Sequence, residues 1–169
     1  TDTPAGSLIL QRRNVSSGAS EDVKRHKAAL RGYLDHLVLA AAGLRDGGDF
    51  RAQVLVAGNK PTAFGVSFKP LSAEAARAQL TALATELLSG VHDYLLPCEA
   101  VFLARGKYAK GRSLAECLAE TVGDERASHS SRYGPIRRFD AYPHPPDAEA
   151  LVERRYGHFF AQLVMEGEA

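Results

Sequence analysis

The sequence predicts an α/β (α+β) fold, with a small mixed sheet flanked by long helices. Residues 21–42 and 72–91 repeat apolar side chains at helical spacing, which indicates two long amphipathic helices. Residues 7–13, 50–57 and 62–69 are short and either alternating or continuously apolar, which is typical of strands. Few strands interspersed with long helices favour helical layers packed against one sheet.

The length of 169 residues suits a single domain with a sizeable core. Hydrophobic residues make up 45% of the chain and charged residues 24%, as in ordinary globular proteins. The formal net charge is only +1, so any nucleic-acid surface must be a local feature. Because the chain begins at Thr1 and its one methionine is Met165, we expect residues 1–169 to be a single domain cut from a longer protein.

The cysteines and the lack of long apolar stretches indicate in which cellular compartment the protein is expected. Cys98 and Cys117 show neither CxxC nor zinc-ligand spacing, so we expect reduced, partly buried thiols. No stretch reaches the roughly 18 apolar residues of a membrane helix, and the N-terminus shows no signal-peptide pattern. We therefore expect a cytoplasmic protein without a membrane partner.

The first half of the chain contains a strand, a helix and a hairpin. A strand at 7–13, expected to be buried on both faces at its start, precedes a helix at 21–42. Ser20 caps this helix and Gly43 stops it. The expected buried stripe of this helix consists of Val23, Leu30, Tyr33, Leu34, Leu37, Val38 and Ala41. Strands at 50–57 and 62–69 flank a turn at 58–61 and form a hairpin.

The second half is predicted to be mainly helical. Ser72 caps a helix whose stripe is Ala76, Leu80, Leu83, Ala84, Leu87, Leu88 and Val91. Because Pro97 interrupts residues 94–103, a turn and a short strand are expected there. Ser113 and Glu116 have capping-box spacing before a short helix, and 123–146 reads as irregular. Asp147 caps a last helix with the inner face Leu151, Tyr156, Phe159, Phe160 and Leu163.

The sequence shows no metal site and implies no cofactor. Restriction-like nucleases combine a PD pair with a later (D/E)xK on a strand, where carboxylates hold Mg²⁺. Here Asp22-Val23-Lys24 and Pro146-Asp147 lie at helix starts and in the wrong order, which favours helix capping. The six histidines lack ligand spacing, and His36 is expected to be a partly buried structural group. Nucleotide-binding and serine-hydrolase motifs are also absent.

A basic segment, RASHSSRYGPIRRF at residues 126–139, contains no acidic residue. Arginine interleaved with aromatic residues suits phosphate contact and base stacking. The candidate DNA-binding residues are Arg126, Arg132, Tyr133, Arg137, Arg138 and Phe139. A second interpretation remains open, in which the aromatics fill the core and the arginines pair with Glu120, Asp124 or Glu125.

Three segments together resemble the C-terminal domain of the exodeoxyribonuclease V gamma subunit, the RecC family. RGYLDHLVLAAAG places Tyr33, His36 and Leu37 where the family has an aromatic residue and a histidine–leucine pair. The family has a run of PLS, a helix and PLPF, and a similar run here is FKPLSAEAARAQLTALATELLSGVHDYLLPCEAVF. The departure from it is Cys98, which follows Leu96-Pro97. RYGPIRRFDAYPHPPDAEALVERRYGHFF resembles the family's ending, and the matches span residues 8–165.

The resemblance implies a restriction-endonuclease-like core without an active site. In active relatives, one strand carries an aspartate and, two residues later, a lysine, and a long helix follows. Aligned with the strand at 7–13, these positions hold Leu10 and Arg12. Leucine cannot bind Mg²⁺, so the resemblance implies that catalysis is lost.

The resemblance also implies a role in double-strand break repair and recombination. It implies a non-catalytic, DNA-guiding domain within the RecBCD complex, an ATP-dependent exodeoxyribonuclease and helicase, with DNA and RecB-like and RecD-like subunits as partners. Two alternatives remain open: a magnesium-dependent DNA nuclease with an unrecognised site, and a pure protein-interaction module. For a subunit of a larger complex, we expect an apolar surface patch that partners bury.

Overall fold

The computed structural model describes residues 6–12, 21–44, 49–57, 62–89, 96–105, 111–123 and 146–165. The chain divides into two compact units. Unit 1 comprises Thr1–Ser16, Ala28–Thr85 and His158–Ala169, and unit 2 comprises Ser17–Lys27 and Glu86–Gly157. Compact units of this kind occur within single domains, so the single domain stays a prediction.

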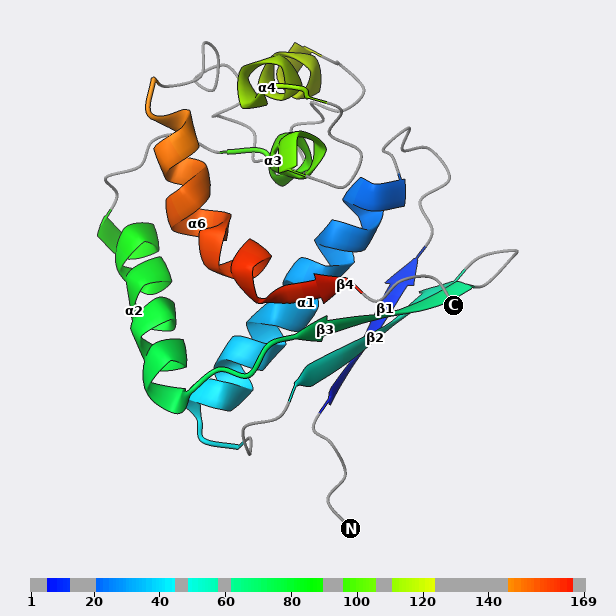
Figure 1. Cartoon of the computed structure of the whole chain (residues 1–169), viewed down its shortest axis with the longest axis vertical. Helices are drawn as coiled ribbons and strands as arrows, with labels where there is room; N and C mark the ends of the chain where they lie inside the picture. The colour runs from blue at the N-terminus through cyan, green and yellow to red at the C-terminus, as the bar shows by residue number, and fades with distance from the viewer. Residues whose placement is uncertain are drawn as a thin grey trace. The chain divides into compact units, whose positions relative to one another are not determined.

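Unit 1 contains a four-stranded mixed sheet in the order β1-β2-β3-β4 (Figure 1). β1 (Gly6–Arg12) pairs parallel with β2 (Phe50–Ala57), and Leu10 lies opposite Leu55. β2 pairs antiparallel with β3 (Thr62–Phe68), which pairs antiparallel with β4 (Leu163–Met165). The predicted mixed α/β fold with a small sheet is therefore confirmed.

Helix α1 (Glu21–Ala41) packs one of its faces on this sheet in unit 1. The ring of His36 stacks on Phe50 and Phe68, at centroid distances of 5.1 and 5.9 Å. Tyr33 packs against Phe68 and Phe159, at 5.5 and 5.6 Å. His36 is fully buried, and its Nε2 lies 3.2 Å from the Lys69 carbonyl oxygen, to which it donates. His36 is thus more deeply buried than predicted.

Gly32 is the point of closest approach between α1 and the sheet. A Cβ added to Gly32 would lie 2.7 Å from the Ala52 Cβ and 3.3 Å from the Ile9 Cδ1. These distances are shorter than ordinary carbon–carbon contacts of about 3.5–4 Å. The absence of a side chain at Gly32 therefore sets how closely the helix can lie on β1 and β2.

The predicted stripes of the two long helices are partly wrong. Leu34 and Val38 of α1 are exposed, whereas small residues and the rings of Tyr33 and His36 are buried. In α2 (Ala73–Ser89), Leu87 and Leu88 are 74% and 83% exposed. Polar Gln79 is buried in α2 instead and accepts a 2.8 Å hydrogen bond from the Tyr33 hydroxyl. In both helices, some of the buried positions therefore hold small or hydrogen-bonded residues where larger apolar residues had been expected.

Three predicted helix boundaries are confirmed. Ser72 Oγ accepts a 3.1 Å hydrogen bond from the Ala75 amide, as an N-cap should. Gly43 follows α1 with a φ of 69°, the left-handed conformation that favours glycine. Ser113 and Glu116 form the capping box before α4 (Leu114–Gly123), since each side chain accepts the other's backbone amide hydrogen at 2.8 and 3.2 Å.

Unit 2 corrects one prediction. Residues 98–105 form a helix, α3 (Cys98–Arg105), where a turn and a short strand were expected. Proline lacks an amide hydrogen, but the first turn of a helix needs none. The Pro97 carbonyl accepts from the Ala100 and Val101 amides at 3.1 and 3.3 Å, so Pro97 begins the helix.

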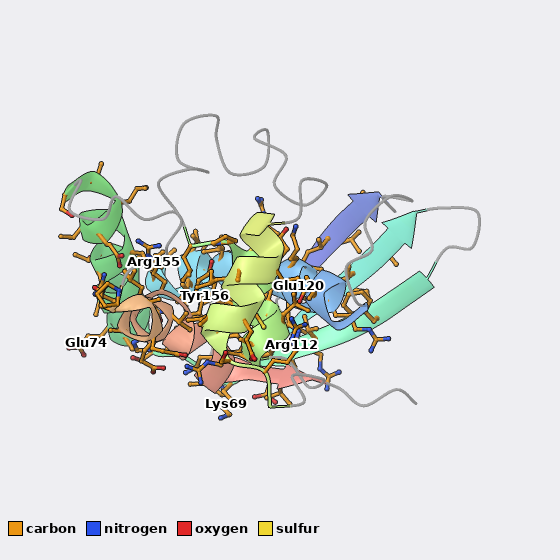
Figure 2. The ribbon with its side chains drawn as sticks, turned by 90° about the horizontal axis from the view of Figure 1, so that it is seen from above. Lys69, Glu74, Arg112, Glu120, Arg155 and Tyr156 are labelled. Atoms are coloured by element: carbon orange, nitrogen blue, oxygen red, sulfur yellow. The ribbon has the colours of Figure 1, made fainter. Side chains whose placement is uncertain are left out.

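The end of the chain gives a second correction. α6 (Ala148–Gln162) stops before Leu163, which was expected on its inner face. Residues 163–165 instead form β4, because β3 offers an open edge. The Lys69 amide donates to the Gln162 carbonyl at 3.0 Å, and Lys69 Nζ donates to the Ala161 carbonyl at 2.8 Å (Figure 2). Among the described residues, no helix is long and apolar enough to span a membrane.

Substitution of two helical glycines by alanine should have opposite effects on stability. Gly32→Ala should lower the free energy of unfolding by about 1–3 kcal/mol, because the methyl group meets Ala52. Gly157→Ala in α6 should raise it by up to about 1 kcal/mol, because its methyl meets only the flexible Glu153 side chain. Chemical denaturation of both variants measures this difference, and equal effects would contradict the close approach at Gly32.

Candidate functional site

The predicted DNA-binding residues lie outside the described residues. This holds for all six candidates: Arg126, Arg132, Tyr133, Arg137, Arg138 and Phe139. Their interpretation as a DNA-contacting segment therefore stays a prediction.

One face of the sheet in unit 1 presents apolar side chains to solvent. Leu8 and Leu10 of β1 are 63% and 75% exposed, and Leu55, opposite Leu10 on β2, is exposed as well. Alternate residues of a strand point to opposite faces, so Leu8 and Leu10 share the face that α1 does not cover. Leu8, Leu10 and Leu55 are the open-face leucines, and they agree with the expected apolar surface, whereas its burial by partners stays a prediction.

Leu10 and Arg12 are the positions that the sequence resemblance aligns with the aspartate and lysine of active nucleases, and this alignment stays a prediction. Of these two, Leu10 has a described side chain, and it lies on the open face. Its neighbours on this face, in the described parts of β2 and β3, include Gln53, Leu55 and Gly65. None of these neighbours is a carboxylate, which a Mg²⁺ site would require.

The two acidic patterns singled out in the sequence both belong to unit 2. The side chains of Asp22 and Lys24 are outside the described set. The Asp147 carbonyl accepts from the Leu151 amide at 3.0 Å, as the residue before α6 should. Searched over the described residues, the chain has no group of three histidine, cysteine or acidic side chains arranged to hold a metal ion.

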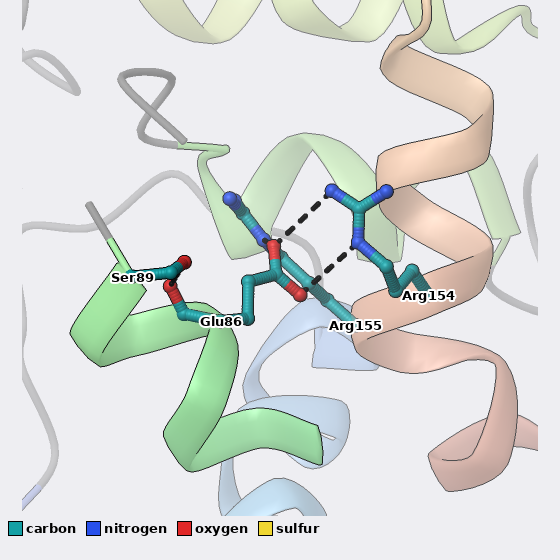
Figure 3. Close-up of polar contacts among 4 residues, drawn as sticks. All are labelled: Glu86, Ser89, Arg154 and Arg155. Carbon is teal, nitrogen blue, oxygen red and sulfur yellow. Dashed lines mark hydrogen bonds and ion pairs between the residues drawn. The ribbon is translucent and has the colours of Figure 1, made fainter. Parts of the chain in front are cut away.

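Unit 2 contains a carboxylate held between two guanidinium groups (Figure 3). Glu86, near the end of α2, accepts from Arg154 Nε and Nη2 at 3.2 and 3.3 Å. It also accepts from Arg155 Nε at 2.8 Å. The side chains of Glu86 and Arg155 are only 15% and 16% exposed, whereas Arg154 is about half exposed. The cluster joins the 86–89 end of α2 to α6.

Burial and charge act in opposite directions on Glu86. Desolvation by burial would raise the pKa of this carboxyl, but hydrogen bonds and charge attraction from Arg154 and Arg155 outweigh it. The pKa of Glu86 is therefore lowered from its ordinary value, and the group is ionised at neutral pH. A bidentate arginine and a second arginine on one carboxylate are a strong arrangement for charge-assisted hydrogen bonds.

A second charged group surrounds Cys98 in unit 2. Lys27 Nζ lies 2.6 Å from Glu99 Oε1, and the Cys98 thiol donates to Glu99 Oε2 at 3.3 Å. Burial, followed by the charge of Glu99, raises the pKa of the Cys98 thiol to about 12. Because thiolate is the nucleophilic form, Cys98 is unsuited to nucleophilic catalysis at neutral pH. Cys98 is partly buried, as expected, whereas Cys117 is fully buried.

Two other arginines of unit 2 also form ion pairs with carboxylates. Arg105 Nη2 lies 2.6 Å from Glu149 Oε2 and links α3 to α6. Arg112 pairs with Glu120, one of the acids considered as a partner for the basic segment (Figure 2). These pairs are exposed, so each contributes little to stability. They nevertheless neutralise much of the positive charge in the described part of unit 2.

Sequence reasoning missed the Glu86 cluster and the outward position of the leucines on β1. Glu86 and Arg154 are 68 positions apart, so local spacing could not associate them. The apolar run at 8–10 indicated a strand buried on both faces, and only the sheet topology shows that one face is open. The sequence contained a single hint of this cluster, which is the adjacent pair Arg154-Arg155 within an amphipathic helix.

Removal of the Glu86 carboxylate should destabilise the chain. Glu86→Ala should lower the free energy of unfolding by about 1–3 kcal/mol, because it leaves two guanidinium groups without their shared partner. Glu120→Ala is the matched control at the exposed Arg112 pair and should have little effect. Thermal or urea denaturation measures both variants, and equal losses would contradict a special role for Glu86.

The contribution of Glu86 should also depend on pH. Its pKa is lowered on folding, so its stabilisation is complete above the ordinary pKa of 4.5 and is lost as pH falls through the folded-state value. The difference in unfolding free energy between the wild type and Glu86→Gln should therefore shrink as pH falls below 4.5. A difference that stays constant from neutral to acid pH would show that the carboxylate charge is not responsible.

Comparison with known proteins does not assign this chain to a group. No protein-family model, curated protein sequence or solved structure was found to match it.

Proposed function

We propose that the chain is a non-catalytic, DNA-guiding and subunit-contact domain of a RecBCD-type helicase–nuclease, exodeoxyribonuclease V. The proposal includes a restriction-endonuclease-like core related to that of the RecC family. Its basis in sequence is the ordered resemblance over residues 8–165. The strand–helix–strand order of β1, α1 and β2 is compatible with such a core.

One observation carries the non-catalytic part of the proposal. Leu10 is on the open sheet face, where the resemblance aligns a metal-binding aspartate. Its described neighbours on that face are apolar, amide or glycine residues. Mg²⁺ requires oxygen ligands, and carboxylates are the usual protein donors. This arrangement favours a scaffold over the alternative of a magnesium-dependent nuclease.

The open-face leucines support the subunit-contact part of the proposal. Exposed apolar side chains that lie side by side commonly mark protein–protein contacts. Leu10 and Leu55 are paired across β1 and β2, and Leu8 shares their face. The same observation favours the second candidate, a pure protein-interaction module, and DNA binding distinguishes the two.

The purified chain should not cleave linear DNA in the presence of Mg²⁺ or Mn²⁺. The expectation rests on Leu10 and Arg12 in place of a metal-binding pair. Gel analysis of end-labelled single- and double-stranded DNA tests it. Metal-dependent cleavage that Asp22→Ala or Lys24→Ala abolishes would instead establish a nuclease.

Single-stranded DNA binding should depend on the basic segment. Arg132→Ala, Arg137→Ala and Arg138→Ala should each weaken binding and reduce the salt slope by roughly one unit for each phosphate that the arginine neutralises. Arg31→Ala is the control, because it removes one exposed arginine from α1. Fluorescence anisotropy over a salt series measures affinity and slope. If all three segment variants keep the affinity and slope of the wild type, the basic segment is only a structural connection. A wild type that binds no DNA at any salt concentration would instead favour the pure interaction module.

A further inference from the structure

Strand β1 forms one edge of the sheet in unit 1. It pairs with β2, and no other described strand lies along its second side. An edge strand directs backbone N–H and C=O groups away from the sheet, where another strand can pair with them. Proteins usually block such edges with short strands, charged residues or proline. β1 is seven residues long and contains no proline, and its one charged residue, Arg12, is at its last position, outside the stretch from Ser7 to Gln11.

The side chains of β1 add apolar surface beside this open edge. Leu8 and Leu10 are both largely exposed on the open face. A strand added at the edge would bring its own alternate residues beside them, where cross-strand apolar pairs stabilise sheets. The edge therefore fits an extended segment with apolar side chains at alternate positions.

β1 itself is such a segment. Around Ile9, the sequence Ser7-Leu8-Ile9-Leu10-Gln11 reads polar, leucine, isoleucine, leucine, polar in both directions. In an antiparallel pair centred on Ile9, each Leu8 would lie opposite Leu10 of the other strand. No like charges would meet between these positions, so nothing in this stretch opposes self-pairing.

We propose that β1 is a dimerisation edge, at which two copies of the chain pair antiparallel about a two-fold axis through Ile9. The two sheets then form one continuous sheet, and the four leucines at positions 8 and 10 form two cross-strand pairs on its open face. A two-fold contact uses the same edge on both copies, so assembly stops at a dimer. This inference does not rest on the proposed role in DNA repair.

Sedimentation equilibrium over a dilution series tests the proposal on the intact chain. The wild type should show a reversible monomer–dimer equilibrium. Leu8→Lys/Leu10→Lys should raise the dissociation constant by at least roughly tenfold, because it places lysine opposite lysine at two positions. Leu87→Lys/Leu88→Lys is the matched control, with the same change at two exposed leucines of α2, and should dimerise like the wild type.

A third variant tests the register. Leu8→Lys/Leu10→Glu loses the same apolar groups but places lysine opposite glutamate in the antiparallel pair centred on Ile9. It should dimerise more tightly than Leu8→Lys/Leu10→Lys. Circular dichroism verifies that each variant is folded, which is expected because both leucines are exposed.

Several outcomes would overturn the proposal. A wild type that stays monomeric at every concentration, or that grows beyond two copies, excludes a closed β1 dimer. Equal weakening by the α2 control would assign association to another surface. If the lysine–glutamate variant dissociates as readily as the double-lysine variant, the strands do not pair in this register.

Discussion

In unit 1, helix α1 packs on the sheet at a separation that only glycine permits. With no side chain at Gly32, the helix backbone approaches Ala52 of β2 closely enough for the rings beside it to reach the sheet. His36 then stacks on Phe50 and Phe68. Because the His36 ring is buried, its Nε2 needs a hydrogen-bond partner within the protein. It donates to the Lys69 carbonyl, just after β3. The packing of α1 on β2 and β3 therefore depends on glycine at position 32.

Unit 2 combines apolar packing with paired charges. Two rings of this unit pack against Phe102: the ring centroids of His26 and Tyr156 lie 5.3 and 5.9 Å from that of Phe102. Glu86, largely buried, is stabilised as an anion only because Arg154 and Arg155 offset its desolvation. Arginine charge in the described part of unit 2 is thus largely used for internal pairing. The DNA contacts expected of the basic segment at 126–139 stay a prediction.

The two faces of the sheet have different chemistry, and the difference bears on function. One face is buried by α1 and is aromatic and aliphatic. The other presents the open-face leucines, at and beside a position that the nuclease resemblance aligns with a metal ligand. Apolar substitution at such a position removes metal affinity and at the same time creates a surface for protein contact. Loss of catalysis and gain of an interface would then be two results of the same residues.

Much of the secondary structure follows from the sequence alone, since local physics determines it. Capping by Ser72 and by the Ser113–Glu116 pair and the left-handed Gly43 depend on neighbouring residues and were predictable. The hairpin of β2 and β3 was predictable for the same reason, because alternation and a turn lie in one short stretch. Pro97 was misjudged because proline both interrupts and begins helices, and only the hydrogen bonds to its carbonyl distinguish the two.

Contacts between distant residues were decided by the tertiary structure. Which side of α1 is buried depends on the fit at Gly32, so His36 is inside while Leu34 and Val38 are outside. β4 exists only because β3 offers it an edge, since residues 163–165 carry a helical pattern by themselves. The Glu86 cluster likewise unites residues 68 and 69 positions apart, which no local pattern encodes. The sequence by itself determined most element types and several helix termini, because these depend on near neighbours, whereas α3 and β4 needed the folded chain. Tertiary packing decided which faces are buried and which charges meet, because both require the chain to be folded.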